Sequence, residues 1–106
     1  MAKYLIHGSY TADGAKGLLK DGGSKRRSVI KSLVEKVGGR LESFYFAFGQ
    51  ADFYVILDLP DAATAAAMSL VVGSSGAASA QTTVLLTPEE IDAATKKSVD
   101  YRPPGA

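Results

Sequence analysis

The stretch from Gly38 to Asp61 constrains this chain more than any other part of its sequence. Two runs of strand-forming residues, 41–48 and 52–59, are joined there into a hairpin by the short turn 49–51. Side chains along a strand point alternately to the two faces of a sheet. Apolar residues occupy both alternating sets: Leu41 and Tyr45 alternate with Phe44 and Phe46, and Phe53, Val55 and Leu57 alternate with Tyr54 and Ile56. The sheet therefore needs a cover on each face.

The elements around this hairpin predict the fold class. Strands are expected at 4–11 and 79–86, and helices at 24–38, at 62–72 after an Asp61 N-cap, and from Thr87 to about residue 98. The segment 11–23 is expected to be a loop with one helical turn. This order predicts an α+β, ferredoxin-like βαββαβ fold, with a four-stranded antiparallel sheet and helices on one face.

The helices can cover only one face of such a sheet. A chain of 106 residues has too little material for a second cover, so a second copy is expected to supply it, giving a dimeric α/β barrel. We expect one domain over residues 1–98, followed by a C-terminal tail over residues 99–106.

Composition excludes several classes of partner. The net charge is +1 with 22% charged residues, which gives no field for nucleic acid or an anionic membrane. No apolar run approaches the roughly 20 residues of a membrane span. There is no cysteine and only one histidine, so we expect neither a disulfide framework nor a metal site, no cofactor, and a cytoplasmic location.

The chain also resembles a known family, the GYD domain family, from about Tyr4 to Ile91. The matching residues are Tyr10-Thr11, Gly14, Arg27, Gly38-Gly39, Gly49 and Asp52 of the hairpin turn, Pro60-Asp61, Thr82 and Thr87-Pro88-Glu89-Glu90. Ala51 and Ala80 stand where the family pattern has a tyrosine and a second threonine. The resemblance implies a ferredoxin-like fold in small bacterial proteins and leaves the activity open.

His7 is the first candidate for chemistry. A lone histidine has a suitable intrinsic pKa for a general base, and a strand position could turn it toward a barrel cavity near Tyr45 or Tyr54, whose phenols could orient a substrate. Because no catalytic partner can be located in the sequence, we favour the other interpretation, a structural histidine hydrogen-bonded under the helices.

A basic turn is the second candidate. Lys25, Arg26 and Arg27 open the helix at 24–38, where positive charge opposes the helix dipole. They could bind an anion together with the Gly22-Gly23 amides, although a solvated turn is the simpler interpretation. Arg27, Tyr45 and Tyr54 are the predicted ligand-binding residues.

Two functions therefore remain open at this point. The first is a non-catalytic oligomeric module that is structural or binds a small apolar or aromatic ligand. The second is a cofactor-independent enzyme, monooxygenase- or isomerase-like, that uses His7 as base on a small aromatic or polyketide-like substrate; it rests on analogy of fold.

Overall fold

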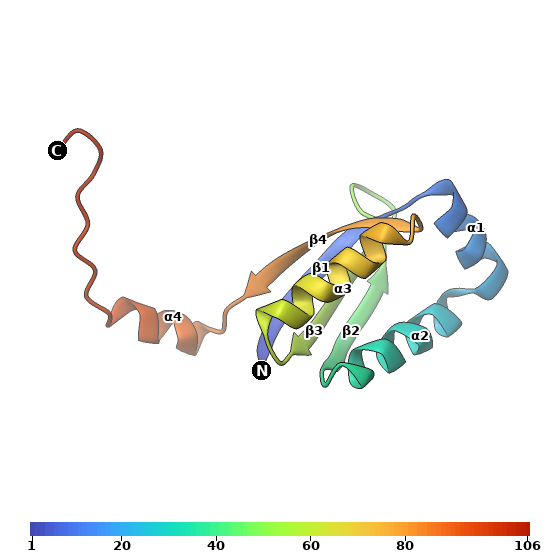
Figure 1. Cartoon of the computed structure of the whole chain (residues 1–106), viewed down its shortest axis with the longest axis horizontal. Helices are drawn as coiled ribbons and strands as arrows, with labels where there is room; N and C mark the ends of the chain where they lie inside the picture. The colour runs from blue at the N-terminus through green and yellow to red at the C-terminus, as the bar shows by residue number, and fades with distance from the viewer.

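The computed structural model describes all 106 residues and contains one four-stranded antiparallel sheet in the order β2-β3-β1-β4 (Figure 1). The elements are β1 (Ala2–Tyr10), α1 (Ala12–Asp21), α2 (Gly23–Lys36), β2 (Arg40–Phe46), β3 (Phe53–Leu59), α3 (Ala62–Ser74), β4 (Ala78–Leu85) and α4 (Pro88–Thr95). The predicted α+β, ferredoxin-like fold is confirmed, because two βαβ-type halves interleave with β1 and β3 at the centre of the sheet.

Helices α2 and α3 cover one face of the sheet, which we call the covered face (Figure 1). The core lies between these helices and the sheet. It comprises Tyr4, Val34, Phe53, Val55, Leu57, Leu59, Ala65, Met68 and Ala78. The alanine-rich α3 has small side chains that let it lie close to the sheet. Leu57, Leu59 and Val34 are the most deeply buried of these side chains, so β3 anchors the core.

The opposite side, which we call the open face, has no helix over it. Alternate residues of β1 and β3 lie there, because strand side chains alternate. Leu5 stands opposite Ile56, and both are half-buried although nothing but neighbouring side chains shields them. The open face therefore keeps an apolar centre exposed to solvent.

Local signals in the sequence set several boundaries as predicted. Asp61 caps α3 by accepting a hydrogen bond from the Thr64 amide at 2.7 Å. Thr87 and Glu90 form a capping box at the start of α4. Gly38 has φ +84°, the left-handed conformation that ends α2 and lets the chain turn back into β2.

The expectation of a loop at 11–23 is wrong, because this segment forms the ten-residue helix α1. Thr11 caps the helix by accepting a hydrogen bond from the Gly14 amide, and Asp13 supplies a negative charge in the first turn. Gly14 and Gly17 weakened the helical signal, but they cost only about 1 kcal/mol each in a helix interior.

The strict alternation expected for β2 is also wrong. The β2–β3 register shifts between Leu41 and Ser43, a bulge that gives β2 one extra residue. Leu41 consequently lies on the covered face together with Phe44, while Tyr45 remains on the open face opposite Tyr54.

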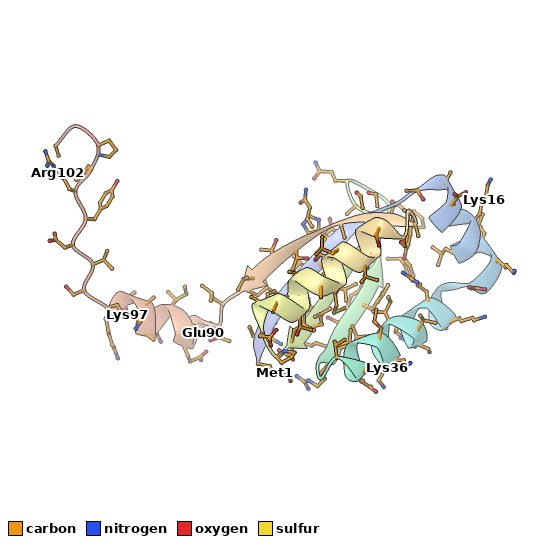
Figure 2. The ribbon with its side chains drawn as sticks, viewed as in Figure 1. Met1, Lys16, Lys36, Glu90, Lys97 and Arg102 are labelled. Atoms are coloured by element: carbon orange, nitrogen blue, oxygen red, sulfur yellow. The ribbon has the colours of Figure 1, made fainter.

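The C-terminal helix α4 lies apart from the sheet. Figure 2 labels Glu90, Lys97 and Arg102 along this segment, which extends away from the end of β4. The helix ends at Thr95 instead of near residue 98 as expected. None of the helices in the chain has the length and apolar character needed to cross a membrane.

Candidate functional site

Three of the four residues predicted to form a site lie together on the open face. In the strand register His7 is opposite Tyr54, and Tyr54 is opposite Tyr45. The rings of His7 and Tyr54 stack with centroids 5.8 Å apart and an angle of 15° between their planes. Tyr54 is 40% and Tyr45 is 70% exposed. The three side chains form one aromatic row across the sheet.

The favoured interpretation of His7 is wrong. A structural histidine under the helices would lie on the covered face, but His7 lies on the open face and its contact is the stack with Tyr54. Its ring is half-exposed in a groove of about 350 Å³ that Tyr54 and Gln81 also line. Stability of the fold therefore does not depend on a buried hydrogen bond from His7.

Arg27 lies away from this row. Its side chain is exposed and lines a groove of about 480 Å³ between α2 and the β2 edge, together with Ser28, Lys31 and Tyr45. The structure thus brings Arg27 near Tyr45 but not into the groove of His7 and Tyr54.

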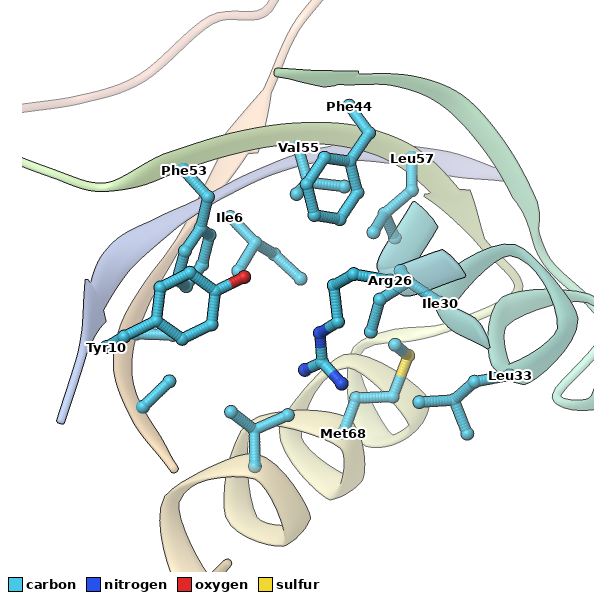
Figure 3. A pocket seen from close by; sticks show the side chains of 13 residues that line it. Ile6, Tyr10, Arg26, Ile30, Leu33, Phe44, Phe53, Val55, Leu57 and Met68 are labelled. Carbon is cyan, nitrogen blue, oxygen red and sulfur yellow. The ribbon is translucent and has the colours of Figure 1, made fainter. Parts of the chain in front are cut away.

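A different site lies inside the covered face. A cavity of about 60 Å³ separates the sheet from α2 and α3 (Figure 3). Of the thirteen residues that line it, twelve are hydrophobic: Ile6, Tyr10, Ile30, Leu33, Phe44, Phe53, Val55, Leu57, Met68, Val72, Ala78 and Ala80. The thirteenth is Arg26. A water molecule occupies about 10–15 Å³ in this measure, so the cavity has room for several water-sized groups.

Arg26 brings a positive charge into this apolar cavity. Its guanidinium points into the space between Tyr10 and Met68 (Figure 3). The ion pairs of the chain involve Lys3, Lys25 and Arg40, and among the arginine side chains only Arg40 and Arg102 donate hydrogen bonds. The Arg26 side chain, which is half-buried, therefore has no partner within the chain.

Tyr10 is the second polar group at this cavity. Its hydroxyl points into the cavity, which Arg26 also lines (Figure 3). Two contacts fix the residue: the Tyr10 amide donates to Asp52 Oδ2 at 2.9 Å, and the ring packs on Phe53 with centroids 5.1 Å apart. Asp52, which follows the hairpin turn, thus binds an amide of β1 and so positions Tyr10.

The sequence contains a signal for Arg26 that the choice of Arg27 overlooked. Arg26, Ile30, Leu33 and Val37 are spaced by four, three and four residues, which places all of them on one face of a helix. A charged residue in line with an apolar stripe is a departure from the usual pattern. That departure indicates Arg26, and not the neighbouring Arg27, as the inward-pointing member of the basic turn.

A network of charges occupies one end of the open face. Lys3 donates to Glu42 and, at 3.1 Å, to Asp58, and Arg40 donates to Asp58 at 3.1 Å. Burial alone would raise the pKa of Asp58, but the hydrogen bonds from Lys3 and Arg40 outweigh it and hold the pKa below its ordinary value of 3.8. The hydrogen bonds to Glu42 and Asp58 raise the pKa of Lys3.

These shifts predict how stability depends on pH. Because the pKa of Asp58 is lower in the folded state, its contribution is fully present above about pH 4 and is lost as the pH falls through the folded-state pKa. Asp58→Asn should lower the free energy of unfolding by roughly 1–3 kcal/mol at neutral pH. The variant should also lose less stability than the natural protein as the pH falls below about 4. Urea unfolding at a series of pH values down to about pH 2 measures this. The control is Asp92→Asn, because Asp92 is exposed on α4. If the stability of Asp58→Asn fell with pH as steeply as that of the natural protein, the prediction would be contradicted.

The chemical groups of the covered-face cavity suit binding better than proton transfer. The charged group in the covered-face cavity is an arginine, which stays protonated and so serves as a binding group instead of a general base. No cluster of three or more His, Cys, Asp or Glu side chains is placed to hold a metal ion.

Comparison with known proteins adds a family to this description. The GYD domain matches residues 4–95, which span β1 through α4. Neither the curated proteins nor the solved structures include a match. The match takes in most of the chain, including both the aromatic row and the cavity. By its sequence, this chain belongs to the GYD domain family.

Proposed function

We propose that this protein is a non-catalytic, homodimeric module that binds a small apolar ligand between its sheet and its helices. The observation that carries the proposal is the cavity on the covered face, with its twelve hydrophobic lining residues. Protein interiors are close-packed, and voids larger than a water molecule are few in a domain. The cavity is smaller than the roughly 300–1,000 Å³ of sites for drug-sized ligands. Together with the adjoining hollow of about 180 Å³ that Tyr10 and Arg26 also line, it is suited to a small ligand.

The open face supports the homodimer. Leu5 and Ile56 lie at its centre, flanked by the His7–Tyr54 stack and by Tyr45. Aromatic residues around an apolar centre are typical of interfaces between proteins. A second sheet placed against this face would exclude water from all five side chains, as in a dimeric α/β barrel.

Helix α4 gives independent support. A free helix of eight residues is unstable in water, because helices shorter than about 12–15 residues are marginal on their own. The sheet of its own chain lies elsewhere (Figure 1), and Ile91 on this helix is 47% exposed. We infer that α4 packs on the second copy, which would cover Ile91.

A cytoplasmic location remains our expectation.

The His7–Tyr54 stack favours the enzyme as a second candidate. In a dimer the groove of about 350 Å³ around these residues would face the second sheet and become enclosed. His7 could then take a proton from a small aromatic or polyketide-like substrate held by Tyr54. If the protein is this enzyme, His7→Ala should abolish turnover of such a substrate without loss of stability. If it is the non-catalytic module, the natural protein should not turn the substrate over.

A ligand titration tests the proposed module. We expect 1-hexanol, a neutral apolar probe, to shift the methyl NMR signals of Met68 and Ile30 in the cavity and to leave that of Ile56 on the open face unchanged. Val72→Phe fills the cavity and should weaken binding at least about tenfold. Val71→Phe is the matched control, because Val71 is exposed on the same helix. Equal binding by both variants, or none by the natural protein, would contradict the proposal.

A further inference from the structure

The position of Arg26 is costly for the free protein. An arginine that loses part of its hydration in an apolar cavity without a hydrogen-bond partner destabilises the fold. Its location near the start of α2 adds to the cost, because the helix has no acidic residue in its first turn to offset the positive end of the dipole. A residue with this cost is explained if an anion pairs with it.

The groups around Arg26 define the charge of that anion. A hollow of about 180 Å³ adjoins the cavity, and both spaces are lined by Tyr10 and Arg26. Asp13 and Asp21 also line this hollow. Asp21 pairs with Lys25 at 3.6 Å, and no carboxylate lies within ion-pair distance of Arg26. One unpaired positive charge with two carboxylates nearby favours a monoanion and disfavours a dianion such as phosphate.

From these observations we infer that the cavity binds a small monocarboxylate with an apolar body, whose carboxylate is held by Arg26 and Tyr10. This inference rests on the proposed ligand-binding function and deepens it. A guanidinium donates two parallel hydrogen bonds that match the two oxygens of a carboxylate. The Tyr10 hydroxyl donates a third. The body of the ligand lies among Ile30, Phe53 and Met68.

The volume limits the length of that body. The cavity of about 60 Å³ is smaller than the roughly 150 Å³ that holds a benzene ring. A short aliphatic chain therefore fits only if the ligand also extends into the adjoining hollow of about 180 Å³. Hexanoate, with a carboxylate on a five-carbon chain, is the matching probe. 1-Hexanol has the same chain length without the charge, so the pair isolates the contribution of the carboxylate.

The test is a titration of the full chain with hexanoate and with 1-hexanol, followed by the methyl NMR signals of Met68 and Ile30. We expect hexanoate to bind the natural protein at least about tenfold more tightly than 1-hexanol. Arg26→Met should remove that preference, and Tyr10→Phe should reduce it. Arg27→Met is the matched control, because the neighbouring Arg27 is exposed in a different groove; it should leave both affinities within twofold.

The melting temperature gives a readout that needs no ligand. Arg26→Met removes an unpaired charge and keeps the length of the side chain, so the ligand-free variant should melt several degrees above the natural protein, while Arg27→Met should melt with it. A lower melting temperature for Arg26→Met would overturn the inference, because it would show a structural role. Arg26→Gln, which also removes the charge, should raise the melting temperature as well.

The outcomes separate this inference from the proposed function. If 1-hexanol binds in the cavity as tightly as hexanoate, the inference is wrong and the apolar binding module stands. If hexanoate binds but Arg26→Met retains the preference, the carboxylate site lies elsewhere and the inference is again wrong. If neither probe shifts the Met68 and Ile30 signals, the proposed function itself fails.

Discussion

Replacing Gly8 by alanine is expected to destabilise the fold by about 2–4 kcal/mol. A Cβ at this position would lie 2.0 Å from the Ser79 carbonyl oxygen and 2.8 Å from Ala80 Cα, both backbone atoms of β4. Since β1 pairs with β3 on one side and β4 on the other, the two strands must separate to admit the methyl group. Urea unfolding followed by circular dichroism measures the loss.

Gly49→Ala is the matched control for Gly8. An added Cβ at Gly49 meets open space, and its φ is not positive, so alanine should change stability by less than about 0.5 kcal/mol. Each kcal/mol corresponds to a shift of about 4–8 °C in the melting temperature of a small domain. If Gly8→Ala melted with the Gly49→Ala control, the close approach of β1 and β4 would be wrong.

Ile56→Asp is expected to convert the proposed dimer to a monomer. Ile56 lies at the centre of the open face opposite Leu5, and a carboxylate enclosed there without a partner would oppose association. The dimer dissociation constant should rise at least about a hundredfold. Sedimentation at micromolar concentration should give twice the chain mass of 11.1 kDa for the natural protein and the single mass for the variant.

Ser32→Asp controls for the added charge. Ser32 is exposed on α2, which packs over the covered face, so this variant should remain dimeric. Circular dichroism establishes that both variants are folded. A natural protein that sediments as a stable monomer at micromolar concentration would show that the proposed dimer is wrong.

The elements with strong local signals could be predicted from the sequence. Asp61 and the Thr87–Glu90 capping box mark helix starts through side-chain hydrogen bonds that involve only nearby residues. Gly38 marks a helix end because its conformation suits glycine. Gly8 lies within β1, where an added Cβ would meet the Ser79 carbonyl; a glycine inside a strand is typical of such a close approach.

Features that depend on contacts distant in the sequence could not be predicted. The bulge after Leu41 contains no glycine and is specified by the register with β3. The face that His7 occupies was undetermined, because β1 has apolar residues in both alternating sets. Helix α1 was missed because its glycines resemble turn signals when its Thr11 cap is not considered.

In the candidate site, too, features set by residues near in sequence could be predicted, and features set by distant contacts could not. The aromatic row was predicted in part, since Tyr45 and Tyr54 belong to the hairpin and pair directly across it. The cavity was not, because it is formed by α2, α3 and all four strands together. Arg26 was passed over because a charge in a basic turn is usually solvated, and only its alignment with Ile30 and Leu33 distinguishes it from Arg27.

The strict alternation of β3 makes its two faces separately adjustable by mutation. Phe53, Val55 and Leu57 line the cavity, while the residues between them belong to the open face. A library that varies only the first set can change the shape of the cavity and leave the open face intact. A library that varies Tyr54 and Ile56 does the reverse. A seven-residue strand thus gives evolution, or an engineer, two interleaved sets of positions to vary independently.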